Sequence, residues 1–125
     1  MLSEAAKIAV PEAIKGVTRV DAEGLIELAE QIPDLIIVDA RQRADRRQGY
    51  IQDSVSLPDT DTTCDSLKGV IPALGAPALF YCNGVKCGRS VIALQIAKSC
   101  GYAQLYWFRG GFEEWKQKGY PFPKL

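Results

Sequence analysis

The 125-residue chain contains no histidine. Without an imidazole, no Cys-His or Ser-His pair can activate a nucleophile, and no histidine can bind a metal ion. A cysteine nucleophile in this chain must therefore become a thiolate by other means, such as nearby cations or the start of a helix.

Long apolar runs and excess charge are also absent. No stretch approaches the roughly 20 apolar residues of a membrane span, and the N-terminus lacks the basic-then-apolar pattern of a signal peptide. Fifteen Lys and Arg balance fifteen Asp and Glu, so bulk charge does not indicate nucleic-acid or membrane binding. We expect one soluble domain, cytoplasmic on the sequence as given, or periplasmic if an export signal has been removed.

The four cysteines are Cys64, Cys82, Cys87 and Cys100, and none of their spacings is a CxxC knuckle. This pattern disfavours a zinc site, and four cysteines are few for a disulfide-stapled fold in a chain of this length. We therefore expect individual thiols, with no metal and no cofactor. Cys64 falls in a polar turn segment and Cys100 on an apolar helix face, so structural roles are predicted for both.

Strand and helix signals alternate along the chain. Strand-like runs occupy residues 18–20, 35–38, 54–57, 78–81 and 104–108. Helical periodicity follows Asp21 and continues from about residue 88 to 100, with a weak helix up to about residue 70 and a last helical segment after Gly111. The fold class predicted is α/β, a five-stranded mainly parallel sheet with helices on both faces, spanning residues 18–125 after an N-terminal extension of residues 1–17.

Cys82 lies at the end of a predicted buried strand, where α/β proteins place their ligands. A glycine-containing loop follows, and a helix begins near Arg89. Free N–H groups, the helix dipole, Lys86 and Arg89 would together favour a thiolate or a bound anion. Cys82 is thus the candidate nucleophile, and the alternative is a small buried residue that ends a core strand.

Four motifs, in order, resemble the rhodanese-like family. They are VDAR at residues 38–41, GYI at 49–51 with SVSLP at 54–58, FYC at 80–82, and WFRGGFEEWKQKGYP at 107–121. The resemblance implies a sulfurtransferase whose cysteine, Cys82, accepts a sulfane sulfur from a donor such as thiosulfate and holds it as a persulfide. A thiol, a cyanide-like acceptor or a protein acceptor then receives it. The resemblance also implies that Lys86 and Arg89 hold the donor anion. The substrate-binding loop that it implies consists of Asn83, Gly84, Val85, Lys86, Cys87, Gly88 and Arg89.

The loop departs from the family pattern in two ways. Six residues separate Cys82 from Arg89 where the sulfurtransferases usually have four, which predicts an enlarged cradle and leaves two alternatives open. One is a non-enzymatic sulfur carrier or interaction module, and the other is a relative of phosphatases or arsenate reductases. The second departure is Cys87, close enough in sequence to form a disulfide with Cys82, to resolve its persulfide, or to do nothing.

Charged residues after the second predicted strand complete the candidate site. Asp39 is expected to pair with an arginine and brace the site, or to cap a helix; Arg41 is a further supporting candidate. Four arginines follow this strand: Arg41, Arg43, Arg46 and Arg47. They either attract anionic donors to the site or are solvated charges on a helix surface. The aromatic residues near the C-terminus are predicted to form core.

Overall fold

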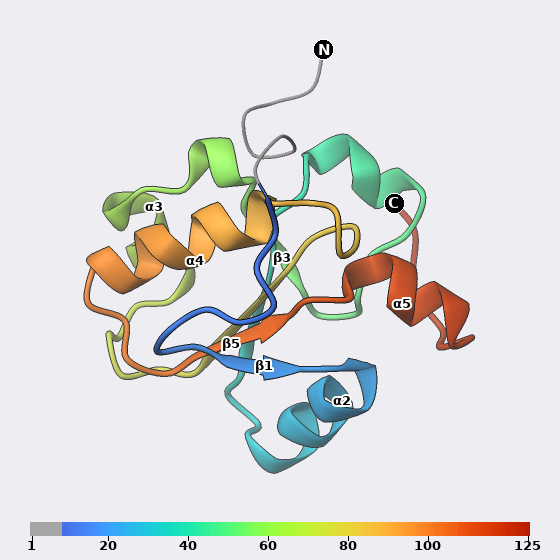
Figure 1. Cartoon of the computed structure of the whole chain (residues 1–125), viewed down its shortest axis with the longest axis horizontal. Coiled ribbons are helices and arrows are strands. Elements are labelled where there is room, and N and C mark those ends of the chain that lie inside the picture. Colours follow the sequence, from blue (N-terminus) through green and yellow to red (C-terminus); the bar gives the residue numbers. More distant parts are fainter. Residues whose placement is uncertain (1–8) are drawn as a thin grey trace.

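A computed structural model describes residues 9–125 and shows a parallel five-stranded sheet (Figure 1). The strand order is β1-β5-β4-β2-β3, and every neighbouring pair is parallel. The strands are β1 (Thr18–Val20), β2 (Ile36–Asp39), β3 (Val55–Ser56), β4 (Ala78–Tyr81) and β5 (Leu105–Phe108). The predicted α/β fold class is confirmed, with β1 and β4 at their expected bounds.

Helices cover both faces of the sheet (Figure 1). One hydrophobic cluster includes residues of α2 (Ala22–Gln31) and α5 (Gly111–Gln117), and the other includes residues of α3 (Cys64–Val70) and α4 (Arg89–Ser99). Two short 3-10 helices, η1 (Arg43–Arg47) and η2 (Asp59–Asp61), follow β2 and β3. The C-terminal aromatics are core as predicted, since Trp107, Phe108, Phe112 and Trp115 are all buried.

Local side-chain bonds explain where the helices begin. Asp21 accepts the Gly24 N–H at 2.8 Å and caps α2, as the sequence predicts. At α3 the side chain of Thr63 accepts the Ser66 N–H at 3.0 Å, and Ser66 Oγ accepts the Thr63 N–H at 2.8 Å. This reciprocal pair stabilises the start of a helix whose apolar pattern is weak.

The two central strands bring the candidate residues together. β4 lies between β5 and β2, and all four of its residues are buried. Tyr81, its last residue, pairs in register with Asp39, the last residue of β2. Cys82 therefore emerges at the middle of the carboxyl edge of the sheet, beside the end of β2.

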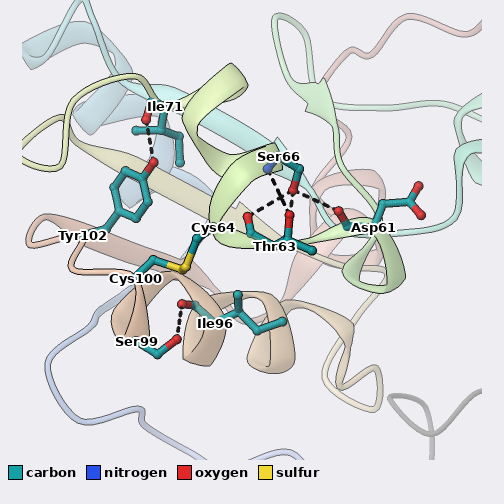
Figure 2. The surroundings of a disulfide bond; sticks show 9 residues. All are labelled: Asp61, Thr63, Cys64, Ser66, Ile71, Ile96, Ser99, Cys100 and Tyr102. Atoms are coloured by element: carbon teal, nitrogen blue, oxygen red, sulfur yellow. Dashed lines mark hydrogen bonds between the residues drawn. A yellow bond between two sulfur atoms is a disulfide. The ribbon is translucent and has the colours of Figure 1, made fainter.

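A disulfide joins Cys64, the first residue of α3, to Cys100 at the end of α4 (Figure 2). The expectation of individual thiols is therefore wrong for this pair, whose Cα atoms are 5.6 Å apart. The two residues are 36 positions apart in sequence, and only the packing of α3 against α4 brings them within bonding distance. Their predicted structural role fits this cross-link.

The described part of the predicted N-terminal extension packs against the domain. Ile14 is buried in the cluster that contains α3 and α4, and Arg109 Nε donates to the Pro11 carbonyl at 2.8 Å. Residues 1–8 of the extension lie outside the described residues, and the boundary at residue 17 stays a prediction. Among residues 9–125 no helix is long and apolar enough to cross a membrane.

Candidate active site

The backbone at Cys82 is held in place by the start of α5. The Cys82 carbonyl accepts the Phe112 N–H at 2.9 Å, and the Asn83 carbonyl accepts the Glu113 N–H at 2.7 Å. Cys82 itself is only 2% exposed. The backbone that carries the Cys82 sulfur is therefore held by β4 before it and by α5 beside it.

The loop from Asn83 to Gly88 leaves most of its backbone N–H groups open. Within residues 9–125, Cys87 alone in this loop donates its N–H inside the chain, to the Gly84 carbonyl at 3.0 Å. Gly88 precedes α4 and offers no side chain to cap it. The remaining loop donors and the first N–H groups of α4 are thus free of such bonds among the described residues, and their binding of an anion or a thiolate stays a prediction.

The two predicted loop cations lie in different environments. Arg89 is 8% exposed, and its Nη1 donates to Asp59 Oδ1 at 2.6 Å, so its charge is already balanced by a buried carboxylate. Lys86 is exposed, and no carboxylate of the described residues is within ion-pair distance of it. Arg89 thus anchors the start of α4 to η2, and Lys86 is the loop cation with an uncompensated charge.

A buried charge network lies beneath the loop, around Asp39. Arg41 makes a two-point contact with this carboxylate, from Nε at 2.9 Å and Nη2 at 2.8 Å. Arg46 Nη1 also donates to Asp39, at 2.9 Å, and the Tyr81 hydroxyl donates to the same carboxylate at 3.0 Å. The expected pairing of Asp39 with an arginine is confirmed, and it involves two arginines. A fully buried carboxylate requires such partners because removing it from water without them is costly.

Arg41 connects this network to the loop. Its Nη1 approaches Asn83 Oδ1 at 3.4 Å, while its guanidinium lies 4.7 Å from the centre of the Phe112 ring. Burial acts to lower the pKa of Arg41, but its hydrogen bonds to Asp39 and the charge of Asp39 raise it overall. Arg41 is therefore a permanent cation that fixes the relation between the end of β2 and the residue after Cys82.

Neither of the two predicted uses of the arginine cluster applies to Arg41 and Arg46. Both are buried and neutralise Asp39, so they are not solvated helix charges and are not free to attract anions. Arg43, by contrast, is exposed and lies 3.5 Å from Asp61, and Arg47 is exposed. The supporting role assigned to Asp39 and Arg41 in catalysis stays a prediction.

The sequence alone did not identify Tyr81 and its neighbour Ser54 as parts of the site. Tyr81 directly precedes Cys82, and its hydroxyl accepts the Ile51 N–H at 3.1 Å and lies 3.2 Å from Ser54 Oγ. Burial, and then the charge of Asp39, raises the pKa of Tyr81 to about 12. An aromatic residue in a strand indicates core packing, and nothing in the sequence shows that its hydroxyl ends in a charge network.

A pocket of about 320 Å³ opens beside the loop. Its lining comes from the arginine segment after β2, from the loop and from α5, and consists of Arg41, Asp45, Gln48, Asn83, Phe112, Glu113 and Lys116. A larger hollow of about 520 Å³ lies elsewhere, lined by apolar residues of α2 together with Leu35, Ile37 and Trp115. We assign the chemistry to the smaller pocket because its lining includes both Asn83, the residue after Cys82, and Arg41 of the buried charge network.

Cys82 and Cys87 are bonded to each other, so the structure describes the oxidised form of the site. Their Cα atoms are 6.2 Å apart across the loop. The disulfide that the sequence left open is thus formed, and neither sulfur is a thiolate in this form. No group of metal-ligating side chains occurs within residues 9–125.

Known proteins with similar sequences and structures point to one family. The sequence model of the rhodanese-like domain matches residues 21–118. Rhodanese domain-containing protein CG4456 of Drosophila melanogaster is 31% identical over 98 residues, covering 69% of this chain and 86% of that protein.

Solved structures share the fold. A thiosulfate sulfurtransferase from Pseudomonas aeruginosa superposes with a TM-score of 0.74 at 20% identity, over 86% of this chain but only 20% of that one. A Rhodopseudomonas palustris protein, described as a possible tyrosine phosphatase, gives a TM-score of 0.71 at 24% identity over 90% of this chain and 98% of its own. Identities this low establish a common architecture and leave the activity to be argued from the site.

Proposed function

Because this chain belongs to the rhodanese-like family and contains a sulfurtransferase-type domain, we propose that its dithiol form transfers sulfane sulfur through Cys82. The observation that carries the proposal is the position of Cys82. It directly follows the central strand β4, and the next residues form a loop with open N–H groups that leads into α4.

The first step loads the sulfur. The Cys82 thiolate attacks the sulfane sulfur of thiosulfate, a new S–S bond forms on Cys82, the S–S bond of thiosulfate breaks, and sulfite departs with the electron pair. Charge and sulfur balance without any oxidant. The loop N–H groups and the start of α4 would stabilise the thiolate before the step and the persulfide anion after it.

The second step unloads the sulfur to an acceptor. Attack by cyanide or a thiolate on the outer sulfur of the persulfide returns the Cys82 thiolate and gives thiocyanate or a new persulfide. Backbone bonds from Phe112 to Cys82 and from Glu113 to Asn83 fix the nucleophile's backbone, so the thiolate does not have to move between the two steps.

Charge also supports an anionic donor. Lys86 is exposed at the loop and free of an ion-pair partner among the described residues, and so would attract the donor. Arg89 already pairs with Asp59, which indicates a role in fixing the loop and α4. The same pair occupies Asp59, so this carboxylate is not free to serve as a general acid in phosphatase chemistry.

Intact mass spectrometry tests the proposal with two matched variants, each of which retains one loop thiol. After reduction and exposure to thiosulfate, Cys87→Ser should gain the mass of one sulfur atom, mapped by peptide analysis to Cys82. Cys82→Ser should gain none at the loop. Sulfur on Cys87 instead, or hydrolysis of an aryl phosphate with no sulfur gain, would overturn the assignment. Loading without turnover on cyanide or thiols would identify a sulfur carrier.

A further inference from the structure

Cys87 is placed to react with the inner sulfur of a loaded Cys82. In the structure Cys87 Sγ is bonded to Cys82 Sγ itself, the atom that would carry the sulfane sulfur. The elements on either side of the loop are fixed: α5 binds the Cys82 and Asn83 carbonyls, and Arg89 binds Asp59. The loop thus reaches a bonded arrangement of the two sulfurs with β4 and α4 in place.

We propose that Cys87 is a resolving thiol that releases the transferred sulfur as hydrosulfide, an inference that rests on the proposed loading of Cys82. The proton that the Cys87 thiol gives up passes to the outer sulfur of the Cys82 persulfide. The Cys87 thiolate then attacks Cys82 Sγ, the bond from Cys82 Sγ to the outer sulfur breaks, and hydrosulfide leaves with the electron pair. The two cysteines supply the two electrons that reduce the sulfane sulfur, and they end as the disulfide seen in the structure.

Local charge favours this attack. Cys87 lies between Lys86 and Gly88, the residue that precedes α4, so a thiolate there is favoured by a neighbouring cation and by the start of an 11-residue helix. Hydrosulfide is a weaker base than an alkyl thiolate and is therefore the better leaving group.

The oxidised loop then requires an external dithiol to restore it. Cys87 is half-buried whereas Cys82 is 2% exposed, so an incoming thiolate has access to Cys87 first. That attack forms a mixed disulfide on Cys87 and expels the Cys82 thiolate into its N–H cradle. A second thiol of the same reductant breaks the mixed disulfide. The whole cycle reduces a sulfane sulfur to hydrosulfide at the expense of a dithiol.

A single-turnover experiment separates this cycle from simple sulfur transfer. The fully reduced chain is mixed anaerobically with an equal amount of thiosulfate and no added thiol, and sulfite, sulfide and protein mass are measured. The native sequence should release one sulfite and one sulfide per chain and lose the two loop thiols. Cys87→Ser and Cys87→Ala should release sulfite, keep the extra sulfur and release no sulfide above background.

Leu74→Ser is the control because Leu74 is 50% exposed, lies before the start of β4 at the opposite edge of the sheet from the loop, and carries no thiol. This variant should release sulfite and sulfide like the native sequence. Cys64 and Cys100 are present in all four proteins, so any sulfide that they produce is the same in each and cancels in the comparison. If the native chain holds its persulfide and releases no more sulfide than Cys87→Ser, the resolving role is wrong and the loading step stands. If no protein releases sulfite, the proposed function fails and the resolving role fails with it.

Discussion

At the scale of single residues, the site depends on a buried carboxylate whose three partners come from three segments of the chain. Asp39 is fully buried and binds Arg41, Arg46 and Tyr81, and Ser54 adds hydrogen bonds to Arg46 and Tyr81. Removing one charged member of such a network leaves a buried charge without its partner, which typically costs about 3–5 kcal/mol. The network is therefore a structural support that fixes the strand ends below Cys82.

Tyr81 gives this network a measurable pH dependence. Its pKa is raised to about 12 in the folded chain from an ordinary value of 10.0, so its contribution is complete below pH 10. As the pH rises from about 10 to about 12, the unfolded chain loses the phenolic proton first, and about 2–3 kcal/mol of unfolding free energy is lost.

Urea unfolding of the native sequence and of Tyr81→Phe, at about pH 9 and about pH 11, measures this difference. Tyr81→Phe should be less stable than the native sequence at the lower pH, because it lacks the bond to Asp39. Its free energy of unfolding should nevertheless fall less than that of the native sequence between the two pH values. The other tyrosines titrate in both proteins and cancel. Equal losses in the two proteins would show that Tyr81 is not the group responsible.

At the scale of elements, the contact of α5 with the Cys82 backbone requires a glycine. Gly111, the first residue of α5, has φ +63°, and a Cβ there would lie within 3 Å of three backbone atoms, two of them at 2.9 Å in Asn83 and Gly84. The chain can approach this closely because glycine has no side chain and tolerates a positive φ. This contact sets the position from which the loop begins.

Gly111→Ala should therefore lower both stability and persulfide loading. The positive φ alone costs about 1–2 kcal/mol for an L-residue, and the added Cβ must also displace the loop. Gly119→Ala is the matched control, because Gly119 has φ +77° but no heavy atom near its Cβ position. Chemical unfolding and the rate of thiosulfate loading should show both losses for Gly111→Ala and only the stability loss for Gly119→Ala. Unchanged loading in Gly111→Ala would contradict this account.

At the scale of the whole molecule, two disulfides serve different purposes at opposite ends of α4. The pair in the loop precedes the helix, and the Cys64–Cys100 pair follows it, a helix length of roughly 16 Å away. Cys64 is exposed and Cys100 half-buried, and their bond fastens α3 to α4 at the edge of the core (Figure 2). This bond closes a much longer segment of chain than the loop pair.

Cys64→Ser/Cys100→Ser should therefore lose more stability than Cys82→Ser/Cys87→Ser when both are compared with the oxidised native chain. Loop-closure entropy predicts a loss of about 4 kcal/mol for the longer segment and about 2 kcal/mol for the shorter one. Denaturant unfolding measures both. The first variant, once its loop is reduced, should still load sulfur because its lost bond is remote from Cys82. A larger loss in the loop variant, or loss of loading in the first, would refute this division of roles.

The sequence by itself determined the α/β architecture and the position of Cys82. Apolar runs of four residues at 78–81 and similar runs elsewhere indicate buried parallel strands, and a cysteine placed directly after such a run falls at the carboxyl edge of the sheet. These conclusions need only local patterns and the general rules of parallel sheets. Helix caps such as Asp21 are equally local, and the structure confirms this one.

Tertiary structure alone decided which charges are free and which cysteines are paired. The sequence does not show that Arg41, Arg46 and Arg89 are buried in ion pairs whereas Arg43 and Arg47 are exposed, because burial depends on segments far along the chain, including Asp59 and Ser54. The Cys64–Cys100 bond likewise depends on how α3 packs against α4. Bonds between distant residues depend on distances in space, and a linear sequence does not contain those distances.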